Sequence, residues 1–130
     1  MAERSRDWLR QAEADLRHAH HARDDGDHNW AAFAAHQAAE KAIKAVFQCR
    51  HLDAWGHMLS VLLENLRPAL EPPVDLVDAA KELDKHYIPT RYPIGFERGA
   101  PVDFYTCRES DHAISNAEAL LAWCRRQVDR

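Results

Sequence analysis

The strongest constraint on this fold is a stripe of alanines between residues 28 and 50. The alanines recur every three or four residues, which places them on one face of a helix, and a bulkier apolar stripe runs beside them. Residues 5–25 show similar spacing after Ser5, which we expect to be the N-cap. The acidic turn around Gly26 separates the two segments, so we predict a closely packed antiparallel helical hairpin.

Prolines divide the second half of the chain into shorter segments. The spacing predicts a third helix over 57–66 and a fourth that begins at Pro73 and ends near Tyr87, because Pro89 disfavours helical geometry in the residue before it. Residues 88–103 form the only long loop that we expect. A capping-box pattern at Thr106 starts a last helix, whose narrow apolar seam suits another helix of the same bundle or of a second copy. The chain is therefore predicted to be an all-α, up-and-down bundle of about five helices.

Length and charge limit the classes of function. At 130 residues the chain is expected to form one domain over 1–130, and no stretch approaches the ~20 apolar residues of a membrane span. The N-terminus lacks the apolar core of a secretory signal, so we expect a cytoplasmic protein with no membrane partner. The net charge of −4 argues against a surface built to bind many phosphates, and we expect no metal or other cofactor.

Three sequence blocks resemble the HEPN family, the higher eukaryotes and prokaryotes nucleotide-binding domain. They are FAAHQAAEKAIKA at 33–45, WGHML at 55–59 and, most specifically, LDKHYIPTRYP at 83–93. The resemblance implies an α-helical bundle, a homodimer and a minimal nucleotidyltransferase as partner. Many members of the wider superfamily are metal-independent RNases with an R-x4-6-H motif near the start of a late helix. The resemblance therefore implies that such a motif, if present, would lie in the last helix of this chain.

The late helix carries an incomplete version of that motif. The only literal match, RDDGDH at 23–28, lies in the turn between the first two helices. Arg108 and His112 are one residue too close for the pattern, but they share a helical face and are the candidate catalytic pair of an RNase, such as the toxin of a toxin–antitoxin pair. The alternative is a solvated first turn, because Glu109 and Asp111 would repel a phosphate.

The long loop offers candidate binding residues. Arg91 and Arg98 could contact phosphates of a nucleotide or RNA, while Tyr87 and Tyr92 could stack on a base. The alternative is structural: Arg91 would form an ion pair with Asp84 or another acid at the rim of the core, and the two tyrosines would pin the loop onto the bundle.

Two lysines of the second helix are weaker candidates. Lys41 and Lys44 share a face with Gln37 and are included as nucleotide-binding candidates, although an ordinary exposed helix face explains them as well. His36 and His57 are expected to be hydrogen-bonded residues at the edge of the core. The four tryptophans are expected to be core residues before they are ligand contacts.

These observations leave three functions open. The first is a HEPN-type nucleotide-binding or interaction module that works with a minimal nucleotidyltransferase. The second is a metal-independent RNase that uses Arg108 and His112. The third is a purely structural oligomeric helical bundle. Whether the chain is an enzyme stays undecided by its sequence, because the late-helix motif is incomplete.

Overall fold

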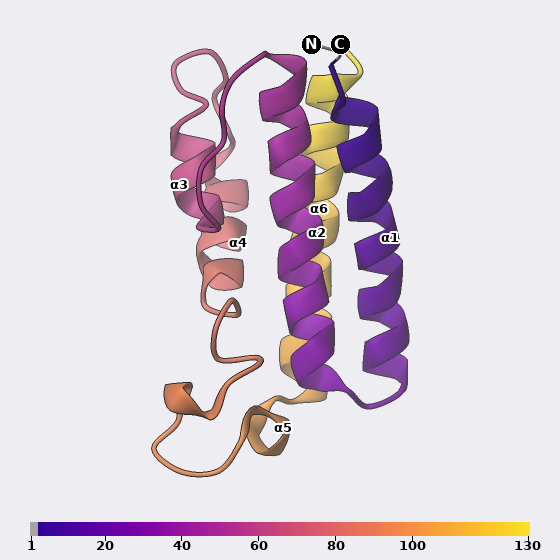
Figure 1. The fold of residues 1–130 in the computed structure, drawn as a ribbon, viewed down its shortest axis with the longest axis vertical. Helices are drawn as coiled ribbons and strands as arrows, with labels where there is room; N and C mark the ends of the chain where they lie inside the picture. Colours follow the sequence, from indigo (N-terminus) through magenta and orange to yellow (C-terminus); the bar gives the residue numbers. More distant parts are fainter. Residues whose placement is uncertain (1–2) are drawn as a thin grey trace.

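Three long helices run side by side through the molecule (Figure 1). A computed structural model describes residues 3–130, and it contains no strand within them. The long helices are α1 (Ser5–Asp24), α2 (His28–Cys49) and α6 (Cys107–Val128), and α2 packs against both of the others. The all-α bundle predicted from the sequence is confirmed. Both chain ends lie at one end of the bundle, and the turn between α1 and α2 lies at the other.

The alanine stripe is what brings α1, α2 and α6 together. Its members on α2 are fully buried, and they let neighbouring backbones approach closely: Ala31, Ala35, Ala38, Ala42 and Ala45. Gly26 makes the tight turn before α2 with a φ of +83°, a conformation that favours glycine. One detail differs from the prediction. Ser5 is the first residue inside α1 and is buried, while Arg4 occupies the N-cap position.

The two middle helices are shorter than the sequence predicts. They are α3 (Leu59–Glu64) and α4 (Val74–Asp84). The carboxylate of Asp84 accepts hydrogen bonds from the backbone N–H groups of Leu59 (2.5 Å) and Ser60 (3.3 Å), so it caps α3 from the end of another helix and leaves His57 outside. A carboxylate also suits the positive end of a helix.

The predicted long loop contains two short helical turns and forms the end of the molecule opposite the chain termini (Figure 1). These turns are a 3₁₀ turn at Pro93–Gly95 and α5 (Pro101–Phe104). The capping box at the start of α6 is confirmed. Thr106 Oγ1 accepts from Glu109 N at 3.1 Å, and Thr106 N donates to Glu109 Oε1 at 3.2 Å.

The tryptophan prediction is wrong for two of the four residues. Trp123 is buried and Trp8 packs partly against the core, but Trp30 is 50% exposed and Trp55 is 81% exposed. The core is complete without them because leucines of α3, α4 and α6 fill the space beside the alanines of α2. Among residues 3–130, no helix combines the length and apolar character that a membrane crossing requires.

Candidate functional site

Arg91 is held by a carbonyl oxygen and three aromatic rings. Its Nε and one terminal nitrogen donate to the carbonyl oxygen of Tyr87 at 2.9 and 2.6 Å. The central carbon of the guanidinium lies 4.2 Å from the ring centroid of Phe33, 4.7 Å from that of Tyr87 and 5.1 Å from that of Tyr92. These distances fit cation–π contacts. The structure therefore brings together three of the predicted binding residues, Tyr87, Arg91 and Tyr92, and adds Phe33 to them.

The alternative of an ion pair between Arg91 and Asp84 is not what the structure shows. Asp84 instead accepts from the start of α3, including Ser60 Oγ at 2.6 Å. Within the described residues 3–130, Arg91 makes no salt bridge, and its second terminal nitrogen makes no hydrogen bond. A guanidinium that is half-buried and not neutralised by a carboxylate is suited to an anion.

Thr90 fixes the loop that presents Arg91. The side chain of Thr90 is fully buried, and its Oγ1 donates to the carbonyl oxygen of His86 at 2.7 Å. Asn29 of α2 donates from Nδ2 to the carbonyl oxygen of Thr90 at 3.0 Å. These bonds tie the backbone on the N-terminal side of Arg91 to the bundle.

A second group of polar residues adjoins Tyr87. The ring of His57 stacks on the ring of Tyr87 with centroids 4.6 Å apart, and its Nδ1 lies 3.0 Å from Glu40 Oε1. Lys44 donates to the other carboxylate oxygen of Glu40 at 3.1 Å. Gly56, with a φ of +90°, makes the turn that delivers His57. The His57 side chain is 51% exposed, so this histidine lies at the surface of the site and not merely at the core edge.

His36 has a structural role beneath this surface. It is fully buried, and burial lowers the pKa of its imidazole, which favours the neutral form. Its Nε2 lies 3.1 Å from the carbonyl oxygen of His57, and Gln37 Nε2 lies 3.2 Å from its Nδ1. A neutral ring that donates from Nε2 and accepts at Nδ1 satisfies both contacts. His36 therefore holds the backbone of His57 in place.

The two lysines of α2 do not form an ordinary exposed face. Lys41 is bonded to Asp15 of α1 at 2.6 Å, and Lys44 is bonded to Glu40. Their side chains are only 25% and 15% exposed. Because each charge has an acidic partner, both lysines stabilise contacts of α2 and offer less free charge to a phosphate than Arg91 does.

Sequence reasoning missed Glu40 and Phe33 as members of the site. Glu40 is 6% exposed although it lies one turn before Lys44, a spacing typical of an exposed ion pair. The signal available was its position among the buried alanines of α2. Phe33 was expected to belong to the bulky apolar stripe, and only the folded loop shows that its ring faces Arg91.

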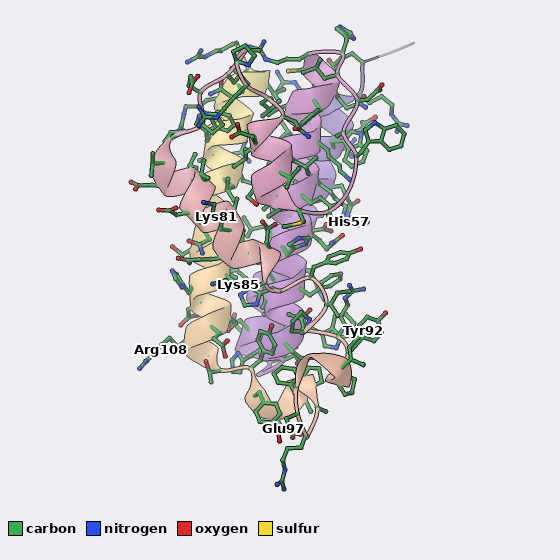
Figure 2. All side chains as sticks on the ribbon, turned by 90° about the vertical axis from the view of Figure 1, so that its left-hand side faces the viewer. His57, Lys81, Lys85, Tyr92, Glu97 and Arg108 are labelled. Atoms are coloured by element: carbon green, nitrogen blue, oxygen red, sulfur yellow. The ribbon has the colours of Figure 1, made fainter. Side chains whose placement is uncertain are left out.

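The remaining predicted residues lie elsewhere. Figure 2 shows Arg108 at the opposite side of the molecule from His57 and Tyr92. His112 Nε2 lies 3.2 Å from Glu82 Oε2, whereas Arg108 has no hydrogen-bond or ion-pair partner among residues 3–130. Arg98 is exposed in the loop. No group of three His, Cys, Asp or Glu residues within 3–130 is placed to hold a metal ion.

A half-buried pair near the start of α6 was also missed. His86 Nδ1 lies 3.0 Å from the hydroxyl of Tyr105. Burial, with a smaller contribution from Glu109, raises the pKa of Tyr105 to about 12, and burial lowers the pKa of His86. A protonated phenol that donates to a neutral imidazole fits both shifts. The pair fastens the end of α4 to the segment that leads into α6.

The chain is similar to a known family of proteins. The HEPN domain model matches residues 5–127. TT1696 from Thermus thermophilus is 45% identical, with a TM-score of 0.94 over 97% of this chain and 99% of that one. ST0689, an archaeal HEPN homologue, is 38% identical, with a TM-score of 0.84 over 98% and 99%.

An HEPN domain protein from Thermotoga maritima is 35% identical, with a TM-score of 0.79 over 95% of this chain and 98% of that one. No curated protein matches the chain.

Proposed function

This chain belongs to the HEPN domain family, and we propose that it is a nucleotide-binding module in which Arg91 holds a phosphate group. The observation that carries the proposal is the setting of the Arg91 guanidinium, which has aromatic rings and a carbonyl oxygen around it but no carboxylate partner among residues 3–130. A phosphate would supply the missing negative charge, and its oxygens would accept hydrogen bonds from the free N–H groups of Arg91.

The surroundings of Arg91 support a nucleotide over a simple anion. Tyr92 is 47% exposed, and its ring lies beside the guanidinium. The half-exposed ring of His57 extends the same row of planar groups through Tyr87. Planar side chains at a surface provide stacking area for a base, and a nearby cation provides the phosphate contact. The two requirements of a nucleotide are thus met by neighbouring residues.

Binding of AMP and ATP by purified protein tests the proposal. Replacement of Arg91 by alanine removes a charge-assisted hydrogen bond, and we expect the Kd to rise roughly ten-fold or more, in line with the ~1.5–3 kcal/mol of such bonds. Arg91→Lys keeps the charge but loses the planar fork and should restore only part of the affinity. Arg108→Ala, on the opposite side, is the matched control. Equal affinities of wild type and Arg91→Ala would contradict the proposal.

The partners inferred from the family resemblance stay predictions. We propose that the module forms a homodimer and works with a minimal nucleotidyltransferase. Sedimentation of the purified chain tests the first point, since a monodisperse monomer would exclude a stable dimer. Co-expression with a nucleotidyltransferase followed by co-purification tests the second, with failure to form a complex as the contrary result.

A further inference from the structure

A small hollow lies between α1 and α2, next to the Arg91 site. Its volume is about 220 Å³, and the residues that matter for its chemistry are Asp15 of α1 and Trp30, Phe33, Gln37 and Lys41 of α2. Clefts that hold drug-sized ligands usually measure ~300–1,000 Å³. A hollow of this size suits one planar ring system better than a whole nucleotide.

Phe33 connects the hollow to Arg91. Its ring lines the hollow and also lies 4.2 Å from the Arg91 guanidinium carbon. The ring of Trp30 meets Phe33 edge to face, with centroids 6.0 Å apart and planes at 76°. Trp30 is 50% exposed, so part of its large apolar surface faces solvent. Two aromatic walls next to an unneutralised cation form a composite surface with an apolar part and an anionic subsite.

Three polar residues of the hollow, Asp15, Gln37 and Lys41, are paired with each other, and the exposed His18 of α1 also lines it. Lys41 donates to Asp15 Oδ2 at 2.6 Å and contacts Gln37 Oε1 at 3.4 Å, while Gln11 donates to Asp15 Oδ1 at 2.8 Å. The Lys41 charge is therefore compensated by Asp15 and is not free for a phosphate. Because of this distribution, the anionic part of a ligand should lie at Arg91 and a neutral part in the hollow.

We propose that this hollow is the base subsite of the nucleotide whose phosphate Arg91 holds. This inference rests on the proposed function and deepens it by assigning the ligand a position and a class. Trp30 provides the exposed stacking surface, and Phe33 separates the base from the guanidinium. Since every base has a π-face, stacking on Trp30 accepts purines and pyrimidines with little discrimination.

Three probes and two matched variants test the subsite. The probes are AMP, adenosine and ribose 5-phosphate, and the variants are Trp30→Leu and Trp55→Leu. Trp55 is 81% exposed and lines a different hollow, with Trp8 and Phe47. We expect Trp30→Leu to raise the Kd for AMP and for adenosine roughly ten-fold, the usual size of a lost base–aromatic stack. The Kd for ribose 5-phosphate should not change, and Trp55→Leu should not affect any probe.

The outcomes separate this inference from the proposed function. If AMP affinity depends on Arg91 but not on Trp30, the base subsite is wrong and the phosphate site stands. A loss of ribose 5-phosphate binding equal to the loss of AMP binding in Trp30→Leu would also overturn the subsite. If Arg91→Ala leaves AMP binding unchanged, the proposed function fails. Quenching of Trp30 fluorescence by AMP, measured against Trp30→Leu, gives an independent readout that must accompany binding.

Discussion

Two arginines of this chain, Arg91 and Arg108, have opposite surroundings. Arg91 is half-buried, bonded to the Tyr87 carbonyl oxygen and surrounded by three rings. Arg108 is exposed in the first turn of α6, between acids that already have partners, since Glu109 caps the helix and Asp111 lies 3.3 Å from Arg23. The two regions contain similar residue types, but only the first restricts its arginine to one position.

A candidate site differs from a charged surface in that contacts within the protein already fix the position of its side chains. A free arginine loses rotamer entropy when it binds a ligand, whereas Arg91 is already oriented by its contacts. The same holds for the two histidines. His57 is positioned by Glu40 and by stacking on Tyr87, while His112 has only an exposed contact with Glu82. Preorganisation favours the Arg91 side as the place where a ligand binds.

The largest effect that we predict is on stability, and it compares two acids of α4: Asp84, which binds the start of α3 on the Arg91 side, and Glu82, which contacts α6. Asp84→Ala removes three hydrogen bonds to the start of α3, and we expect it to lower the free energy of unfolding by about 2–3 kcal/mol. Glu82→Ala removes partly exposed contacts to His112 and Asn116 and should cost less than ~1 kcal/mol. Urea unfolding of both variants measures the difference.

Asp84→Ala should also weaken AMP binding, because the cap on α3 fixes the segment that carries His57. Asp84→Asn keeps one acceptor oxygen and should recover part of the stability. If Glu82→Ala were as destabilising as Asp84→Ala, the two sides would be equally ordered and the comparison would be wrong.

A smaller effect concerns two histidines whose pKa burial lowers, the fully buried His36 near Arg91 and the half-buried His86 near α6. Burial lowers both pKa values below the ordinary 6.5, so the unfolded chain binds protons that the folded chain does not. Stability is therefore fully present above that value and is lost as the pH falls below it. Each histidine contributes at most about 1.4 kcal/mol per pH unit.

Unfolding free energies between about pH 7.5 and about pH 5.5 check this prediction. His36→Gln and His86→Gln should each remove part of the decline, and the double variant should remove more than either. The same decline in His36→Gln and the wild type would show that His36 is not held neutral. If only one of the two variants reduces the decline in stability, the histidine replaced in that variant is the one that responds to acid.

The sequence predicts the helices well because their signals are local. The alanine spacing and the Thr106–Glu109 capping box depend on neighbours within one or two turns, and both are confirmed. The start of α3 was predicted two residues too early because Asp84, from a distant segment, caps the helix at Leu59. Sequence spacing contains no information on a cap supplied by another helix.

Only part of the candidate site could be predicted from the sequence, because its other contacts join segments that are far apart in the chain. The block at residues 83–93 contains Arg91 and both tyrosines, but the alternative partner Asp84 binds the start of α3 instead. Glu40 was not predicted as a site residue, because its burial depends on packing that the sequence pattern alone does not encode. Trp30 and Trp55 were assigned to the core by residue type, although the alanines and leucines already fill it.

The smallest effects should come from the α6 pair. Arg108 has no partner among the described residues, and the His112 side chain is 64% exposed, so Arg108→Ala and His112→Ala should each change the free energy of unfolding by less than ~0.5 kcal/mol. AMP affinity should stay within about two-fold of wild type, because Arg108 lies on the opposite side of the molecule from Tyr92 and His112 contacts Glu82 instead of the Arg91 site. Metal-free cleavage of RNA by the wild type, abolished by either substitution, would overturn this prediction. That result would assign an RNase function to Arg108 and His112, although their side chains are less restrained than that of Arg91.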